Sequence, residues 1–290
     1  MAQKHVIVTC CDARYGEFLI QHWLRSLQAN VDLTGVDVVV LDYGLTECQR
    51  ATLRSLQVIC FPCVKDGVVC NLRYRDMCRL FDDTEYDQVL SIDSGDVIFQ
   101  ADIRPLFDVH QDQFRGVVED LQIPFNELLI GHSDIKPDRC KAMLRFLRDR
   151  PTVNAGAIWG PARGFRKFLQ FYNETCSNFN CFGVDQMVLN YLLYQEGFQP
   201  IDRGYNFVLV SCNTKYSIRD GVFYDQVGRT IPIVHNAGNR DVTRVINNFG
   251  YGPGHNRQKK WLPMGVKILV NASRAWKGLT HLLHPNASNL

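Results

Sequence analysis

The feature that most constrains this chain is an alternation, over its first hundred residues, of short apolar runs with longer amphipathic stretches. Val36 to Asp42 is an apolar run of strand length, which is typical of a strand covered on both faces. Gln88 to Ile92 is a second such run. Strands and helices that alternate in this way predict an α/β fold of the Rossmann-like kind, with a mainly parallel sheet and helices on both faces.

The same patterns extend through most of the chain. We expect strands at residues 5–10, 36–42, 58–61, 88–92, 115–120, 153–160, 207–210 and 231–235. We expect helices at residues 17–29, 47–56, 72–81, 138–148, 163–176 and 183–196. Ligands of such sheets bind beyond the carboxyl ends of the strands, so polar residues at those ends are the candidates for function.

The composition suits one large domain, since 46% of the 290 residues are hydrophobic and 21% are charged. We expect this domain to span residues 1–250, because Gly250-Tyr-Gly-Pro-Gly254 interrupts the pattern. A first strand is expected to start at His5, and no run of eighteen apolar residues occurs. Neither a signal peptide nor a membrane-spanning helix is therefore predicted, and the expected location is the cytoplasm.

Eleven cysteines, an odd number, are spread through the expected strands and helices. This favours free thiols in a reducing compartment over a disulfide framework. Cys60-Phe-Pro-Cys63 has the C-x-x-C spacing of redox and zinc sites, but no second pair follows at zinc-ribbon distance. The preferred interpretation is that the cysteines are small buried hydrophobic residues.

Charge is distributed unevenly along this chain of net charge +2. No acidic residue follows Asp241, whereas seven basic ones do, and subtracting those seven leaves −5 for residues 1–241. The acidic body argues against nucleic-acid binding. The basic extension, residues 251–290, is expected to form a helix that either packs on the domain or lies on an anionic membrane surface, which would place the protein at the inner face of a membrane.

The strongest local signal is Val89-Leu-Ser-Ile-Asp93-Ser-Gly-Asp96, where a buried strand leads into two carboxylates. Two carboxylates at the end of one strand repel each other unless a cation lies between them. Hard oxygen ligands suit Mg²⁺ or Mn²⁺, which usually bridges substrate phosphates as well. The alternative is that the two aspartates only form a turn and cap the next segment.

The stretch around these carboxylates resembles the GT-A glycosyltransferases, and most closely the retaining glycosyltransferase family 8 of glycogenin and bacterial lipopolysaccharide galactosyltransferases. That family has a similar strand before an aspartate pair, and a next segment similar to Ile103-Arg-Pro-Leu-Phe107. The family pattern is D-x-D, whereas this chain has D-x-x-D, so Gly95 must let the turn bulge. The resemblance implies a metal site made of Asp93, Asp96 and His235, the last from Ile231-Pro-Ile-Val-His235.

Further stretches match the family in the same order over residues 5–240. The resemblance implies that the nucleotide-sugar is bound by Asp12, Tyr15, Arg75, Ser94, Gly238 and Arg240, with Arg244 as a second candidate for the phosphates. Judged from the residues alone, Tyr15 offers a stacking face and Asp12 an acceptor. The alternatives are that Tyr15 packs in the core and that Arg75 lies on a solvated helix face.

Two later stretches are similar to segments that surround the transferred sugar in the family. Val153-Asn154-Ala-Gly is similar to its N-A-G strand, and Gly183-Val-Asp185-Gln186 to the start of its D-Q helix. The resemblance makes Asn154, Asp185 and Gln186 the candidates for catalysis. Glycines in a short apolar strand do permit close approach of another group. For Asp185 and Gln186 the alternative is simple capping of a helix.

Together these expectations describe a metal-dependent enzyme that transfers a sugar, with retention, from a nucleotide-diphosphate donor. The acceptor is a carbohydrate, a lipid-linked molecule or a protein, and is expected near residues 114–138. One alternative is a nucleotidyltransferase that makes activated sugars, although no glycine-rich signature with a basic residue follows the first strand. Another is a catalytically silent protein that binds a sugar nucleotide or a partner, which the irregular spacing of Asp93 and Asp96 allows.

Overall fold

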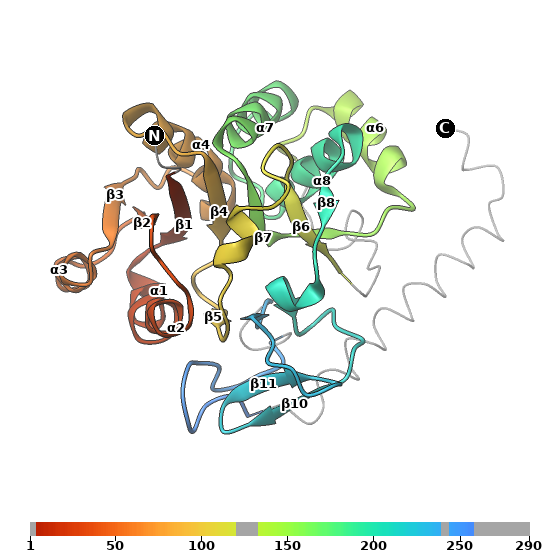
Figure 1. Cartoon of the computed structure of the whole chain (residues 1–290). Coiled ribbons are helices and arrows are strands. Elements are labelled where there is room, and N and C mark those ends of the chain that lie inside the picture. Colours follow the sequence, from red (N-terminus) through yellow and green to blue (C-terminus); the bar gives the residue numbers. More distant parts are fainter. Residues whose placement is uncertain (1–3, 120–132, 239–243, 258–290) are drawn as a thin grey trace.

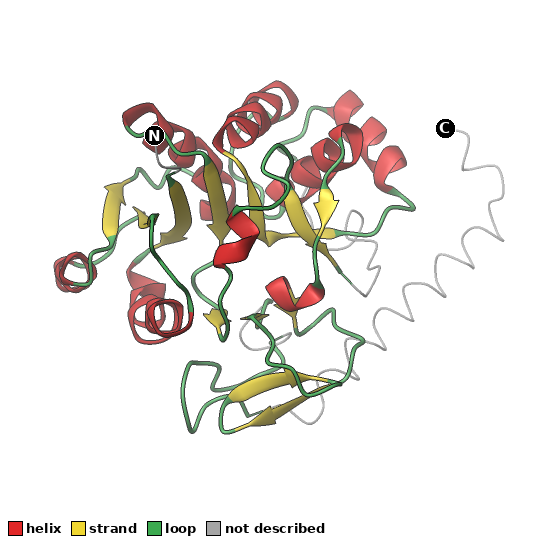
Figure 2. Ribbon diagram, viewed as in Figure 1, coloured by secondary structure: helices red, strands yellow, loops and turns green. Residues whose placement is uncertain are grey.

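A seven-stranded sheet runs through the computed structural model, which describes residues 4–119, 133–238 and 244–257 (Figures 1 and 2). In order across the sheet the strands are β3 (Ile59–Pro62), β2 (Val36–Asp42), β1 (His5–Cys11), β4 (Gln88–Ile92), β7 (Val153–Pro161), β6 (Arg115–Val118) and β8 (Gln199–Pro200). The first four are parallel to one another, whereas β7 is antiparallel to β4 and to β6. The prediction of a mainly parallel sheet is confirmed, with β7 as the reversed strand.

Helices cover both faces of this sheet, as the alternating pattern predicted (Figure 1). One face carries α1 (Ala13–Phe18), η1 (Leu19–Leu24), α2 (Arg25–Asn30) and α3 (Glu47–Ser55). The other face carries α4 (Val69–Asp83), α6 (Pro137–Leu147), α7 (Ala162–Thr175) and α8 (Val184–Glu196). Side chains alternate along β1, so that Val6 and Val8 belong to one apolar cluster and Ile7 to the other.

The first helical region is more complex than the single helix expected at residues 17–29. It begins at Ala13, because Asp12 caps the helix by accepting a hydrogen bond from the backbone N–H of Arg14. Its middle part, η1, is a π-helix, a wider turn that is often found at functional sites. By contrast, α3 is the single helix expected there, and Thr46 caps it in a reciprocal arrangement with Gln49.

A second, smaller sheet carries residues from distant parts of the chain to one edge of the large sheet. It consists of β5 (Val97–Phe99), β12 (Ile233–His235) and β9 (Phe207–Val208), with β12 in the middle. Strands β5 and β12 are antiparallel, and their register pairs Val97 with His235. Two short 3₁₀ turns, η2 (Arg104–Phe107) and η3 (Arg203–Asn206), lie nearby in the chain, and η3 leads directly into β9.

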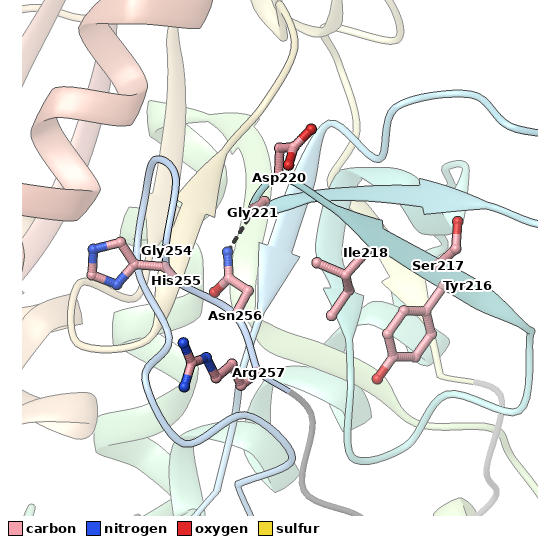
Figure 3. A pocket seen from close by; sticks show the side chains of 9 residues that line it. All are labelled: Tyr216, Ser217, Ile218, Asp220, Gly221, Gly254, His255, Asn256 and Arg257. Atoms are coloured by element: carbon pink, nitrogen blue, oxygen red, sulfur yellow. Dashed lines mark hydrogen bonds between the residues drawn. The ribbon is translucent and has the colours of Figure 1, made fainter.

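A hairpin of β10 (Tyr216–Arg219) and β11 (Val222–Asp225) was not among the expected elements. Its turn is Asp220-Gly221, and both residues have positive φ, as two-residue hairpin turns require. This dipeptide was the available sequence signal. The hairpin and residues 254–257 line an open hollow of about 400 Å³, where the Asn256 side chain donates to the Gly221 carbonyl (Figure 3).

The start of the basic extension packs on the domain. The backbone N–H of Tyr251 donates to Nδ1 of His22 at 3.1 Å, and the side chain of Asn30 donates to the Tyr251 hydroxyl. The helix expected farther along, and any membrane contact through it, lie outside the described residues. None of the helices in the described part is both long and apolar enough to cross a membrane. All eleven cysteines are free thiols.

Candidate functional site

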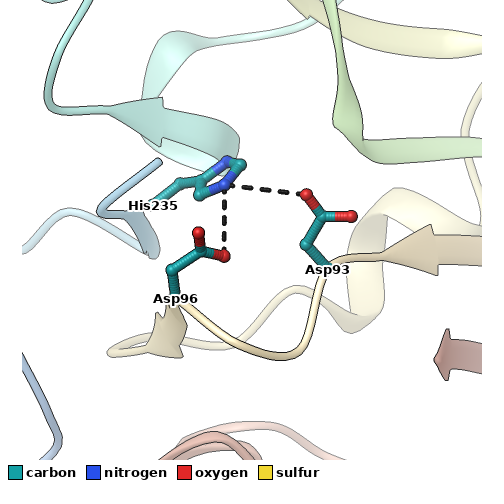
Figure 4. Close-up of side chains that lie close together, drawn as sticks. All are labelled: Asp93, Asp96 and His235. Atoms are coloured by element: carbon teal, nitrogen blue, oxygen red, sulfur yellow. Dashed lines mark ion pairs between the residues drawn. The ribbon is translucent and has the colours of Figure 1, made fainter. Parts of the chain in front are cut away.

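Three potential metal ligands converge where the two sheets meet. Asp93 directly follows β4, Asp96 directly precedes β5, and His235 ends β12. The register that pairs His235 with Val97 places the imidazole beside Asp96, although 139 residues separate them in the chain. One ligand atom from each of the three lies within 4.8 Å of the others, and the side chains point toward one another (Figure 4).

Each of the two carboxylates has one oxygen bound to an arginine and the other facing the imidazole. Asp93 accepts from Nη1 of Arg73 at 2.5 Å, and its second oxygen lies 3.8 Å from Nε2 of His235. Asp96 accepts from Nη2 of Arg244 at 2.7 Å, and its second oxygen lies 3.5 Å from the same Nε2. The arginines therefore orient the carboxylates and leave one oxygen of each facing His235.

Neighbouring charges outweigh burial in setting the pKa values of Asp96 and His235. Burial alone would raise the pKa of Asp96, but the neighbouring His235 and Arg244 outweigh burial and lower it below the ordinary value. Burial alone would lower the pKa of His235, yet Asp96 and Asp93 raise it above the ordinary value. In the absence of a cation, the negative charge of the carboxylates thus favours a proton on the imidazole.

The donor set fits a divalent cation. Mn²⁺ binds carboxylate oxygens and imidazole nitrogens, and Mg²⁺ binds oxygens. Neighbouring ligands of an octahedral ion with bonds of about 2.1 Å lie about 3 Å apart, and here Nε2 of His235 lies 3.8 and 3.5 Å from the two carboxylates, with all three ligand atoms within 4.8 Å of one another. Gly156 keeps this space open, because a Cβ there would overlap Cε1 of His235 and lie 3.0 Å from Asp93.

The arginine that contacts Asp93 is Arg73, two positions before Arg75, which was predicted to bind the donor. Arg75 forms ion pairs with the exposed Asp66 and with the fully buried Asp76. The helical periodicity of α4 could have indicated Arg73 as the buried arginine, because Arg73 shares a helix face with the buried Met77 and Leu80. A buried arginine needs a charged partner, and the half-buried Asp93 and the buried Asp185 provide it.

Asp185 is linked to Asp93, one of the three potential metal ligands, through the same guanidinium. Nη2 of Arg73 lies 3.1 Å from its carboxylate, while Nη1 binds Asp93. The backbone N–H of Asp185, at the start of α8, donates to the side chain of Asn71. Burial raises the pKa of Asp185, and Arg73 opposes that rise. The predicted catalytic carboxylate therefore lies one guanidinium away from Asp93.

The amide of Gln186 is bonded to the backbone of β7. It accepts from the N–H of Ala155 at 3.0 Å and donates to the carbonyl of Val153. Asn190, one turn later, bonds both the N–H and the carbonyl of Val153. These side chains satisfy polar backbone groups of this part of β7, so Gln186 and Asn190 dock α8 onto the strand.

Asn154 lies between the potential metal ligands and the edge of the expected acceptor region. Its Oδ1 accepts from the backbone N–H of Gly156, and its Nδ2 donates to Glu119 at 2.6 Å. Glu119 is the last described residue before residue 133. Of the acidic and polar residues expected to border the acceptor there, Asp120, Asn126, Glu127 and His132 lie outside the described residues.

Two of the predicted nucleotide-sugar residues follow β1, and a third follows β4. Asp12 caps α1 and forms an ion pair with Lys65 at 2.8 Å. Tyr15 packs its ring against Gly95, where a Cβ would lie only 2.8 Å from the ring. Ser94 donates its hydroxyl to the carbonyl of Cys10 at 2.6 Å and so ties the carboxylate turn to β1. The turn that bears Asp93 and Asp96 and the segment that follows β1 are thus neighbours.

The closing loop is described only in part. Gly238 is exposed with φ of 112°, and its carbonyl accepts from Nε of Arg244. Arg240, the predicted partner of the phosphates, lies outside the described residues. Arg244 is paired with Asp96, so in this structure its charge is directed at the carboxylate.

Three contributors to the site were not foreseen. Arg73 is described above. Asn206, at the end of η3, contacts both His235 and Asn154, and no sequence pattern marks it. Trp23, on the π-helix η1, donates its indole N–H to the backbone carbonyl of Asp93 at 2.9 Å. These contacts arise only from the folded arrangement, because each joins residues far apart in the chain.

Similar solved structures share this fold. The galactosyltransferase LgtC, in complex with donor and acceptor sugar analogs, is 16% identical with a TM-score of 0.51, over 92% of this chain and 95% of that one. The bifunctional glycosyltransferase WbbM is 15% identical with a TM-score of 0.55, over 82% of this chain and 46% of that one. The glycosyltransferase GlyE of Streptococcus pneumoniae TIGR4 is 15% identical with a TM-score of 0.51, over 95% and 64% respectively.

No protein-family model matches the sequence, and no curated protein does. The likeness is therefore one of architecture. The chain has the GT-A fold and resembles glycosyltransferase family 8 in structure, as the sequence motifs indicated.

Proposed function

We propose that this protein is a metal-dependent glycosyltransferase that uses a nucleotide-diphosphate sugar as its donor. The observation that carries the proposal is the convergence of Asp93, Asp96 and His235 at the edge of a GT-A sheet. In this proposal the three side chains bind Mn²⁺ or Mg²⁺. The LgtC structure with donor and acceptor sugar analogs supports a sugar donor and a carbohydrate acceptor.

When bound, the cation supplies charge neutralisation for the diphosphate that leaves the sugar. The protein's own residues prepare the site. Arg73 and Arg244 fix the carboxylates, and Ser94 ties their turn to β1. We assign Asp12 and Tyr15 to the nucleotide, and Gly238 with Arg240 to the phosphates. Arg75 stays assigned to the donor on the sequence alone; in the structure it is paired with Asp66 and Asp76.

The transferred sugar develops positive charge at its anomeric carbon. We propose that Asp185 lies near that carbon, while Asn154 positions ring hydroxyls. Gln186 is the third candidate, and to contact the sugar it must release a bond to β7. Retention of configuration is proposed because the similar family retains it.

The decisive test replaces Asp96 with Asn. The variant keeps the size of the side chain but removes a ligand charge and one acceptor oxygen, so nucleotide-sugar hydrolysis with Mn²⁺ should fall by about 100-fold or more. Hydrolysis is measured first without acceptor, which separates an active enzyme from a silent binding protein. Asp82→Asn, on the outer side of α4, is the matched control. Undiminished activity of Asp96→Asn would refute the proposal.

The donor base is best identified by thermal denaturation with each nucleoside diphosphate, in the presence and absence of Mn²⁺. A ligand that binds only the native state raises its stability, so the correct base should give the largest increase in melting temperature. That increase should require Mn²⁺. An increase independent of Mn²⁺ would indicate nucleotide binding without the metal.

A cytoplasmic location and contact of the basic extension with an anionic membrane remain proposals based on the sequence. Flotation of the full chain with anionic and neutral vesicles tests the contact. Binding to the anionic vesicles alone would support it, and failure to bind them would remove it.

A further inference from the structure

A continuous row of hydrogen-bonded, buried polar side chains joins His235 to Glu119. Nδ1 of His235 lies 3.0 Å from Oδ1 of Asn206, and Nδ2 of Asn206 donates to Oδ1 of Asn154 at 3.0 Å. Nδ2 of Asn154 in turn donates to Glu119 at 2.6 Å. All four residues are at least nine-tenths buried, so bulk water does not replace these bonds.

The direction of every bond in this row is set by one backbone group. The N–H of Gly156 can only donate, and it donates to the Asn154 side chain at 2.9 Å, so the oxygen of that amide must face Gly156. The same oxygen accepts from Asn206, whose NH₂ group must therefore face Asn154. The Asn206 oxygen is then directed at His235, and because an amide oxygen only accepts, Nδ1 must carry a hydrogen.

We propose that Asn206 is a positioning residue that holds His235 with the hydrogen on Nδ1, leaving the Nε2 lone pair free for a metal ion, and that links this ligand to Asn154. The part that names the metal rests on the proposed function. A histidine ligand generally donates its second ring N–H to a fixed acceptor, and loss of that acceptor typically weakens metal binding about 10- to 100-fold. Here the acceptor is a neutral amide, oriented in turn by a backbone N–H.

Two variants of Asn206 separate its functions. Asn206→Asp keeps an oxygen that accepts from Nδ1–H but loses the donor to Asn154. Asn206→Ala loses both. Titration calorimetry of the full chain with Mn²⁺ should show at least wild-type affinity for Asn206→Asp, and an affinity about 10- to 100-fold lower for Asn206→Ala. Recovery by the aspartate would not occur if the residue only filled space.

Asn256→Ala is the matched control for removing a buried asparagine. Asn256 is also more than nine-tenths buried, and it bonds the carbonyls of Gly221 (Figure 3) and Gly250, neither of which belongs to the proposed metal site. Its replacement should leave the Mn²⁺ affinity unchanged. Melting curves of all variants establish that the folded chain is titrated. Wild-type affinity in folded Asn206→Ala would overturn the proposal.

The position of the ring hydrogen is measured independently of any metal. Nitrogen NMR of the metal-free protein is recorded at increasing pH until the His235 ring shows one protonated and one unprotonated nitrogen, with His235→Gln to assign the signals. Wild type and Asn206→Asp should carry the hydrogen on Nδ1, and a hydrogen on Nε2 in wild type would overturn the inference. If wild type binds no Mn²⁺, the metal part of the proposed function fails, while this spectrum still decides the role of Asn206.

Discussion

The site has two sides that are built on different principles. On the charged side, Asp93, Asp96 and Asp185 are bound by Arg73 and Arg244, so that charged side chains are partners of one another. On the amide side, the partners of Gln186, Asn190 and Asn154 include backbone groups of β7. A charged group can exchange one charged partner for another, such as a cation, whereas an amide bound to the backbone is fixed by the fold. Exchange of partners is therefore expected on the charged side, and fixed geometry on the amide side.

The largest expected effect tests the charged side. Arg73→Met leaves the buried Asp185 without its cation and frees Asp93, so the free energy of unfolding should fall by about 3–5 kcal/mol. Urea denaturation at neutral pH measures this loss. Arg166→Met, which breaks an exposed pair with Asp82, should cost at most about 1 kcal/mol. Equal losses in both variants would show that the buried pairs are not what stabilises this side.

A smaller effect on the charged side is a gain in stability when a cation binds. Mn²⁺ at a hundredfold excess over its dissociation constant should stabilise the wild-type protein by about 2.7 kcal/mol, because it binds only the native state. Differential scanning calorimetry with Mn²⁺ and with a chelator measures the change. Asp96→Asn should show no such increase. An equal increase in that variant would place the ion elsewhere.

On the amide side, removal of a side-chain amide should lower stability without leaving a charge unpaired. Gln186→Leu leaves the N–H of Ala155 and a lone pair of the Val153 carbonyl without that partner, which should cost about 1–3 kcal/mol in urea denaturation. Gln195→Leu, on the exposed side of the same helix, should change stability by less than about 0.5 kcal/mol. If Gln186→Leu is as stable as wild type, Gln186 is free for catalysis and the comparison fails.

The smallest expected effect lies at the edge of the charged side. Asp12→Asn breaks a partly exposed pair with Lys65, and should change stability by only about 0.2–1 kcal/mol. Nucleotide affinity should nevertheless fall if Asp12 binds the nucleotide as proposed. Calorimetric titration with the nucleoside diphosphate chosen by thermal denaturation measures that affinity. Unchanged affinity would remove Asp12 from the proposed donor site.

The sequence also predicted these two sides of the site to different extents. The strand leading to Asp93 was predicted with its observed bounds, 88–92, because a continuous apolar run marks a strand buried on both faces. The turn that bears Asp93 and Asp96 follows directly from that strand. His235 entered through a family resemblance and is placed by the register of β12 against β5.

The other parts of the site depend on contacts that no local pattern encodes. Arg73 was missed in favour of Arg75, although the helical period placed Arg73 on the buried face of α4. Asn206 comes to lie beside His235 because η3 leads into β9, which pairs with β12. Gln186 was interpreted through the family as a sugar contact, whereas its observed partners are backbone atoms of β7. A polar side chain in a sequence does not reveal whether its partner is a ligand or the chain itself.

The wide turn of η1 makes the length of the first helical region part of the site. Trp23 reaches the carbonyl of Asp93 from within this turn. A π-turn holds one residue more than the α-helical turn it replaces, so deletion of one residue between Leu19 and Leu24 can be absorbed by conversion to an ordinary α-helix, with the flanking helices kept in place. Insertion of a further residue cannot be absorbed in this way, and in a regular helix it would rotate the residues on one side of it by about 100° relative to those on the other. Insertions should for this reason be tolerated less well than deletions in this part of the region.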